Sequence, residues 1–520
     1  MLLMRRFFIS IVCLALWCVS AFAQLTEQQQ IQKLNYVYQQ LRNNYVDDVP
    51  LEPLVEEAIK ATLKELDPHS IYLSPKQMAD LRIRLRGEYA GVGIRYNMHN
   101  DTMVVRGTLE DSPAGRAKIQ LNDRITAIDG KSIIGVPTDS IATLLRGEAN
   151  TKVSIDIVRR SEDKPLKITL SREFIASSAI SAAFRVGDVG YISISKFSKP
   201  VGSEFLQAYK ELGKIKSLIV DLRDNGGGAI TSAIDLTSLF LEKGDVIVST
   251  EGRTNSIVYD KKRDNRIDCP IVVIINENSA SSSEIFAGAI QDHDRGVVIG
   301  HTSFGKGLVQ KVIDLKDGSG ITLTIARYKT PSGRTIQRPY TMGKSDEYRT
   351  DSLRYMHPDS IPYDSELLFR TLKRGRKVYG GGGITPDVYI DTDSIQLSQR
   401  LSQLYSEAVF EHTAIEYWDG ASPKVIGKQH PTIEEFADNF QLSDGIYNIF
   451  CRYAQCSLDD FTELDQRFIR TMLMASIAEQ LYGDSARQYI YCLGFDYMMQ
   501  RALEIIADAE AYERILSPAN

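Results

Sequence analysis

The sequence predicts a multidomain α+β protein with four folded parts: an N-terminal helical region, a compact β-rich module, a layered α/β core and a C-terminal helical extension. Three observations support this fold class. The chain has 520 residues, and a domain commonly holds about 100–200, so several domains are expected. Apolar residues recur at helical spacing near both ends of the chain. The middle instead carries short β-rich runs broken by turn residues.

Composition and charge exclude several classes of protein. Hydrophobic residues make up 43% and charged residues 25% of the chain, which is ordinary globular usage rather than that of a disordered or fibrous protein. The net charge of -6 provides no basic field for phosphates, so we expect no nucleic-acid partner. The 7 histidines are scattered and none has zinc-site spacing. We therefore expect no metal and no cofactor.

Residues 1–23 have the three parts of a secretory signal peptide. Arg5 and Arg6 precede an apolar run over residues 7–22, and Ala21-Phe22-Ala23 supplies a small-x-small ending. We expect cleavage before Gln24 and a periplasmic or other extracytoplasmic location for the mature protein. An uncleaved anchor helix is the alternative interpretation.

Residues 24–86 are expected to form the N-terminal helical region. Thr26 and Gln29 have the spacing of a capping box, and apolar residues follow at helical intervals. Pro53 suits the first turn of a second helix.

Residues 87–165 form the predicted β-rich module, in which Gly91-Val92-Gly93-Ile94 is a loop of small and apolar residues. The module resembles a PDZ domain. That resemblance implies that the successive amides of Val92, Gly93 and Ile94 bind the C-terminal carboxylate of a peptide, which adds to the sheet as an extra strand. A β-hairpin whose glycines serve only its tight turns is the alternative.

Strand-like runs alternate with helical stretches over residues 166–400, as in a layered α/β core. A polar, tyrosine-rich stretch at about 338–379 is predicted to be a surface insertion. Residues 401–520 are expected to be helical, with one helix starting near Ser457 and a second long helix over residues 489–515. This helical domain could serve dimerisation, docking of an adaptor or simple packing.

The serine-rich segment Asn278–Ile285 follows a strand-like run and precedes a helix-like run. A turn of this kind exposes a hydroxyl beside helix N-terminal amides, which can stabilise an oxyanion, although capping alone would also use serine. A serine nucleophile needs a base. Lys306 lies among apolar residues and glycines, surroundings that can depress the pKa of its amine.

These segments resemble the C-terminal processing peptidases, also called tail-specific serine proteases, which use a Ser-Lys dyad. The resemblance implies that Ser281 is the nucleophile, that Lys306, 25 residues further on, is the base, and that Gln310 positions its amine. It also implies an oxyanion site made by the amides of Ser282, where the family usually has alanine, and Gly227. Gly228 is the alternative to Gly227.

The resemblance implies a serine endopeptidase that recognises proteins or peptides with free apolar C-termini through its PDZ domain. A homodimer or an adaptor bound through the C-terminal helices is a possible further partner. Two other functions stay open at this point. One is a non-catalytic PDZ adaptor on a protease-like fold, and the other is a Ser-His-Asp hydrolase that uses His293 between Asp292 and Asp294.

Overall fold

The computed structural model describes residues 26–109, 111–262, 264, 266–350, 365–391, 396–421 and 423–518. The predicted signal peptide therefore lies outside the described residues. The chain divides into two compact units, one ending at Leu66 and the other starting at Asp67. Within the described residues, no helix combines the length and apolar character needed to cross a membrane.

The first unit contains two helices, α2 (Glu27–Asn44) and α3 (Leu51–Lys64). The predicted capping box at the start of α2 is confirmed. The amide of Gln29 donates to Oγ1 of Thr26 at 3.3 Å, and the amide of Thr26 donates to Oε1 of Gln29 at 2.8 Å.

The N-terminal helical region predicted over residues 24–86 also contains one short strand. The short strand β1 (Ile71–Leu73) precedes α4 (Pro75–Arg86) and pairs antiparallel with β18 (Gly320–Lys329). A three-residue strand carries too little periodicity to be recognised, and its partner lies far away in the sequence. Residues from Asp67 onward therefore belong to the second unit.

The β-rich module has a sheet in the order β3-β4-β5-β7-β8, with β6 paired to β5. Its sheet extends past the predicted boundary at residue 165, because β8 pairs in register with β7, with Ile168 opposite Ile155. The elements are β2 (Glu88–Gly91), β3 (Ile94–His99), β4 (Thr102–Thr108), α5 (Pro113–Arg116), β5 (Arg124–Ile128), β6 (Lys131–Ser132), α6 (Thr138–Leu145), β7 (Lys152–Val158), β8 (Leu166–Ser171) and β9 (Glu173–Ala176).

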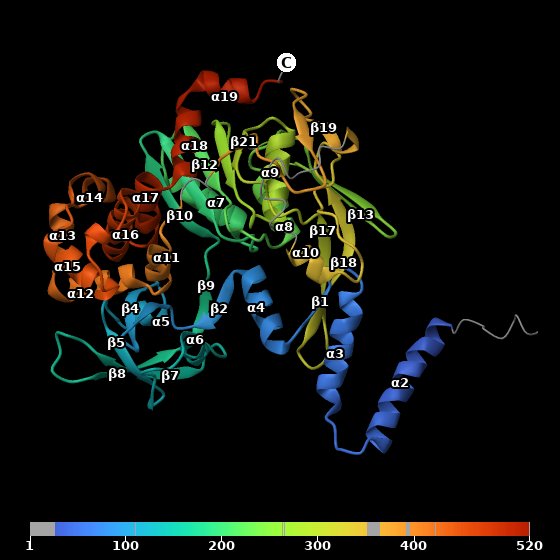
Figure 1. Cartoon of the computed structure of the whole chain (residues 1–520), viewed down its shortest axis with the longest axis horizontal. Coiled ribbons are helices and arrows are strands. Elements are labelled where there is room, and N and C mark those ends of the chain that lie inside the picture. Colours follow the sequence, from blue (N-terminus) through green and yellow to red (C-terminus); the bar gives the residue numbers. More distant parts are fainter. Residues whose placement is uncertain are drawn as a thin grey trace, which may run out of the picture. The chain divides into compact units, whose positions relative to one another are not determined.

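The central sheet of the core has the order β10-β11-β12-β15-β16-β21, parallel from β11 onward. Alternate residues of its buried strands face opposite sides. One face packs on α7, α8 and α9, and the other packs on the C-terminal helices (Figure 1). The elements are β10 (Ile180–Val186), β11 (Val189–Ile194), α7 (Val201–Glu211), β12 (Ser217–Asp221), α8 (Ile230–Thr237), β15 (Ile271–Ile275), α9 (Ser282–Asp292), β16 (Val297–Gly300) and β21 (Val388–Tyr389).

A second sheet of the core has the order β1-β18-β13-β14, and β17 pairs with β18. Its strands are β13 (Val246–Gly252), β14 (Ser256–Asp260) and β17 (Leu308–Asp314), with β1 and β18 as above. The segment predicted as an insertion contains α10 (Ser345–Thr350), a 3-10 turn at Ser365–Leu367 and the hairpin of β19 (Leu368–Arg370) and β20 (Lys377–Tyr379).

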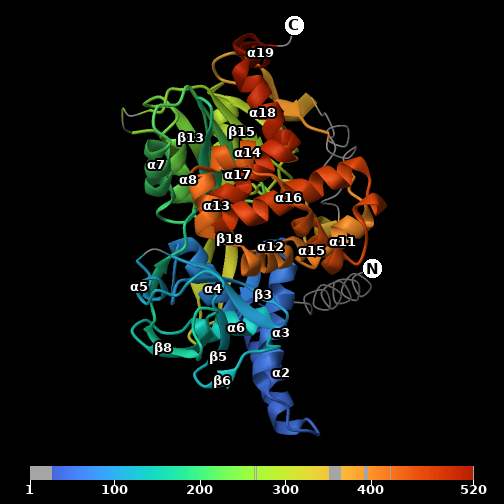
Figure 2. The same ribbon diagram turned by 90° about the vertical axis from the view of Figure 1, so that its left-hand side faces the viewer.

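The C-terminal extension is helical, as predicted (Figure 2). Its buried apolar residues share one core with a face of the central sheet. One long helix was predicted over residues 489–515. The structure instead has three shorter helices, α17, α18 and α19, across this stretch. The helices are α11 (Gln399–Ser406), α12 (Val409–Gly420), α13 (Pro423–Gln429), α14 (Ile433–Asn439), α15 (Asp444–Ala454), α16 (Glu463–Tyr482), α17 (Asp484–Gly494), α18 (Tyr497–Ala507) and α19 (Ala509–Ile515), with a 3-10 turn at Leu458–Asp460. The four cysteines in the described part of the chain, Cys269, Cys451, Cys456 and Cys492, are all free.

Candidate active site

A cleft of about 940 Å³ opens beyond the carboxyl ends of β12 and β15, the edge of a parallel sheet where ligands commonly bind. The turns after these two strands contribute Gly227 and Ser281 to the cleft wall. Lys306 and Gln310, from the segment that enters β17, lie in the same wall. Residues predicted from distant segments of the sequence thus meet in one cavity.

Ser281 lies on a tight turn between β15 and α9, and α9 begins at the next residue, Ser282. Its backbone has φ 55° and ψ -109°. A positive φ is unfavourable for a residue with a side chain, and such strain is typical of nucleophiles held on a strand-turn-helix elbow. The geometry presents the side chain of Ser281 to the cleft.

The neighbouring serines hold the turn in place. Their hydroxyls donate to carbonyl oxygens of the turn after β12: Ser279 to Leu222 at 2.8 Å, Ser282 to Gly228 at 3.2 Å and Ser283 to Asn225 at 2.8 Å. In contrast, the Ser281 hydroxyl donates no hydrogen bond of this kind among the described residues, and its side chain instead takes part in the capping box with Glu284 at the start of α9.

Lys306 is half-buried, and its Nζ donates to Oε1 of Gln310 at 2.9 Å. The amide nitrogen of Gln310 donates in turn to the carbonyl oxygen of His69 at 2.5 Å, which orients Oε1 toward the lysine. Burial lowers the pKa of the Lys306 amine. The carboxylates of Glu284 and Asp67 oppose this shift, and the positive charge of Arg84 adds to it. Within the described part of the chain, Nζ of Lys306 and Oγ of Ser281 make no direct hydrogen bond.

Two side chains connect the serine turn to the lysine segment, and sequence reasoning assigned neither a role. The Tyr328 hydroxyl lies 3.2 Å from the carbonyl oxygen of Ser281 and 2.5 Å from that of Lys306. The buried carboxylate of Glu284 accepts hydrogen bonds from the amides of both Ser281 and Lys306. Glu284 was part of the recognised motif, but a motif does not reveal which distant backbone groups a side chain will bind.

One predicted oxyanion donor is available and the other is not. The Ser282 amide, at the first position of α9, has no acceptor among the residues described. The Gly227 amide instead donates to Oδ1 of Asn225 at 2.9 Å, so in this conformation it is not free to bind an oxyanion. The alternative, Gly228, is exposed, and its amide likewise has no acceptor within the described ranges.

Three family models match the chain. Peptidase family S41 matches residues 188–343, a PDZ domain matches residues 104–159, and a family of unknown function (DUF8443) matches residues 401–483. The carboxy-terminal-processing protease of Bartonella bacilliformis is 39% identical over 59% of this chain and 73% of its own length. The chain belongs to peptidase family S41.

Other similar proteins carry related names. A probable CtpA-like serine protease of Staphylococcus aureus is 32% identical over 73% of this chain and 76% of its own length. Among solved structures, a photosystem II D1 C-terminal processing protease is 26% identical over 69% of this chain and 87% of its own, with a TM-score of 0.35. This S41 protein is a carboxy-terminal-processing serine protease with a PDZ domain, so the non-catalytic adaptor is excluded.

His293, the base of the alternative Ser-His-Asp mechanism, lies at the opposite end of α9 from Ser281 in this S41 protease. A helix of 11 residues is about 16 Å long at 1.5 Å per residue, too far for a proton transfer. The His293 ring is buried, with Nε2 2.7 Å from the carbonyl oxygen of Val246. His293 is therefore not placed to act as the base for Ser281.

The PDZ loop predicted to bind a carboxylate is held by the backbone around it. Its fold is fixed by two backbone bonds: Ala114 donates to the oxygen of Val92, and Leu109 donates to that of Gly93, both at 2.9 Å. The amides of Val92 and Gly93 have no acceptor in the described part of the chain. Ile94 opens β3, an edge strand that a peptide can extend.

Proposed function

We propose that this S41 protease hydrolyses peptide bonds with Ser281 as nucleophile and Lys306 as base. The observation that carries the proposal is the environment of Lys306: its amine is half-buried beside the cleft, donates to Gln310 and has a lowered pKa. A neutral amine has a lone pair that can accept a proton, which an ordinary solvated lysine lacks near neutral pH. Both residues line the same cleft.

In the proposed reaction, Oγ of Ser281 attacks the scissile carbonyl carbon while Nζ of Lys306 takes the hydroxyl proton. The amides of Ser282 and Gly228 donate to the oxyanion that forms. Lys306 then gives the proton to the leaving amine, which departs as the new N-terminus. Water, deprotonated by Lys306, hydrolyses the acyl-enzyme and regenerates Ser281.

We also propose that the PDZ domain binds free apolar C-termini of protein substrates. Support comes from the amides of Val92 and Gly93 and from the edge strand β3. Extracytoplasmic location remains a proposal that rests on residues 1–23 of the sequence. Intact-mass analysis of the mature protein tests it, and a mass that retains residues 1–23 would contradict it.

The dyad is tested by turnover of an unfolded protein with an apolar tail. Ser281→Ala and Lys306→Ala should each lose on the order of 10⁴-fold in kcat, and the double variant should be little worse, because nucleophile and base act as one unit. His293→Ala is the control. When folded, it should keep most of the activity of the native enzyme. Full activity of Lys306→Ala, or loss confined to His293→Ala, would overturn the dyad.

A further inference from the structure

A second cavity, of about 580 Å³, lies between the carboxyl ends of the central strands and the C-terminal helices. On the core side it is lined by Asp221, Arg223 and Asp224 from the end of β12 and the turn after it, and on the helical side by residues that include Asp496. Asp224 also lines the catalytic cleft. The turn after β12 therefore has the catalytic cleft on one side and the C-terminal helices on the other.

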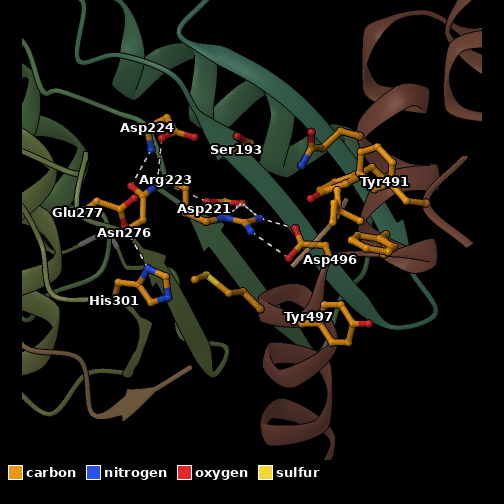
Figure 3. Close-up of a pocket in the computed structure, with 15 residues that line it drawn as sticks. Ser193, Asp221, Arg223, Asp224, Asn276, Glu277, His301, Tyr491, Asp496 and Tyr497 are labelled. Carbon is orange, nitrogen blue, oxygen red and sulfur yellow. Dashed lines mark hydrogen bonds and ion pairs between the residues drawn. The ribbon is translucent and has the colours of Figure 1, made fainter. Parts of the chain in front are cut away.

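The side chain of Arg223 lies between two carboxylates (Figure 3). Its Nη1 donates to Oδ1 of Asp496 at 2.9 Å and its Nη2 donates to Oδ2 at 2.6 Å, a bidentate pair. Its Nε lies 3.0 Å from both oxygens of Asp221, at the end of β12. The side chains of Asp221 and Asp496 are only 4% and 3% exposed, so solvent screens these contacts little.

Asp496 is itself fixed by the C-terminal extension. It is the N-cap of α18, and its Oδ1 accepts a hydrogen bond from the amide of Met499 at 3.1 Å. The helix determines where this carboxylate lies, and the bidentate contact then determines where the Arg223 guanidinium lies.

The same turn leads directly to the catalytic groups. The carbonyl oxygen of Asn225 accepts hydrogen bonds from the Ala280 amide at 3.0 Å and from the Ser283 hydroxyl at 2.8 Å. These contacts join the turn after β12 to the turn of the nucleophile Ser281. Two residues separate Asn225 from Gly228, a donor in the proposed oxyanion site.

We propose that Asp496 is a positioning residue for catalysis, which acts through Arg223 to place the oxyanion turn against Ser281. This inference rests on the proposed function of that turn. Attachment of the C-terminal helices does not require the ion pair, because the helices already share a large apolar core with the central sheet. In some proteins a buried ionic contact fixes one geometry, which is the role assigned to this pair here.

The test compares Asp496→Asn with Asp508→Asn in the full-length protein. Asparagine caps helices as well as aspartate does, so Asp496→Asn keeps the cap but removes the charge and directs an amide NH₂ at Arg223. Asp508 is the exposed N-cap of α19 and provides the matched control. Removal of an oxyanion donor costs about 10²–10³ in kcat, so a displaced donor should cost about 10–100-fold, with KM within about threefold.

A double-variant cycle shows whether Asp496 acts through Arg223. Arg223→Lys loses the bidentate contact and should resemble Asp496→Asn, and the double variant should be no worse than the more affected single. Additive losses, a kcat for Asp496→Asn within twofold of the native enzyme, or an equal loss in Asp508→Asn would overturn the proposal. So would a change confined to KM.

Amide hydrogen exchange gives a readout that does not depend on catalysis. Exchange at residues 222–228 should be faster in Asp496→Asn than in Asp508→Asn, and equal exchange would count against the positioning role. An active Ser281→Ala variant would overturn the dyad without changing the exchange result, so the two failures are distinguishable. Thermal unfolding of each variant shows whether it folds. If Asp496→Asn does not fold, Arg223→Lys tests the same contact.

Discussion

Oε2 of Glu284 lies 2.9 Å from the backbone nitrogen of Lys306 and accepts its hydrogen bond. The same oxygen accepts the amide of Ser281 at 2.7 Å, so one atom connects the nucleophile turn to the segment of the proposed base. Oε1 accepts the hydroxyl of Ser303 at 2.6 Å and the amide of Gly305 at 2.7 Å. The fully buried carboxylate thus accepts four hydrogen bonds, and all four donors belong to the two catalytic segments.

Glu284→Gln should reduce both activity and stability. The substitution keeps the shape of the side chain, but its NH₂ group must face two donors that previously bonded to a carboxylate oxygen. A buried donor left without a partner costs about 1–3 kcal/mol in the free energy of unfolding. An equal loss of transition-state stabilisation corresponds to about 10–100-fold in kcat. Denaturant unfolding and turnover measure the two effects, with the exposed Glu463→Gln as control. An unchanged kcat in Glu284→Gln would contradict the role of Glu284 in holding the two segments together.

Activity should rise with pH as Lys306 loses its proton. Burial lowers the pKa of this amine, Glu284 and Asp67 partly oppose the shift, and the charge of Arg84 adds to it, so the net pKa is lowered and the neutral form is present at a lower pH than for an exposed lysine. Arg84→Gln removes the second effect and should shift the acidic limb of the kcat profile to higher pH. Arg86→Gln, another exposed arginine in the last turn of α4, should leave the profile unchanged. A shift to lower pH in Arg84→Gln would reject Lys306 as the titrating base.

The sequence alone suggested where reactive groups could lie, but it did not select them. A serine-rich turn before a helix is also explained by capping. The resemblance to a known family, with its spacing of 25 residues from serine to lysine, is what pointed to Ser281 and Lys306.

The rest of the site depends on contacts between segments far apart in the chain. Nothing in the sequence near Asp496 indicates that it binds Arg223, and nothing near Tyr328 indicates that it contacts the carbonyl of Ser281. The occupied amide of Gly227 has the same origin. The buried side chain of Asn225 turns back onto the Gly227 amide, a local conformation that only the packed loop determines.

A peptide with a free apolar C-terminus should bind the PDZ domain more tightly than its amidated form, because amidation removes the charge that the amides of Val92 and Gly93 are placed to receive. Fluorescence polarisation measures both affinities. Gly93→Ala should weaken binding of the free acid, since Gly93 has φ 79° and a Cβ there would lie 2.2 Å from Cβ of Ser112. Gly135→Ala, at another positive φ but in open space, is the control. Equal affinity for the two peptides would reject this loop as a carboxylate site.

The contact between the PDZ domain and the C-terminal extension contains two histidines, His99 and His412, whose rings meet edge to face. The rings of His99 and His412 lie 4.9 Å apart between centroids, and His412 Nε2 lies 3.1 Å from the carbonyl oxygen of Met98. Burial, followed by the proximity of His412 and Arg124, lowers the pKa of His99 from 6.5 to about 4. His99 is therefore neutral in the folded protein at neutral pH.

This shift predicts a loss of stability in mild acid. In the unfolded chain His99 takes up its proton near pH 6.5, whereas in the fold it does so only near pH 4, so the unfolded state binds more protons between these values. The free energy of unfolding should thus fall as the pH decreases from about 6.5 to about 4, and the loss from this residue should level off below that range. His99→Gln removes the titrating group and should unfold with a shallower pH dependence over the same window, measured by denaturant unfolding at a series of pH values. Parallel curves for His99→Gln and the native protein would show that His99 titrates normally, and that the contact with His412 does not exclude its charged form.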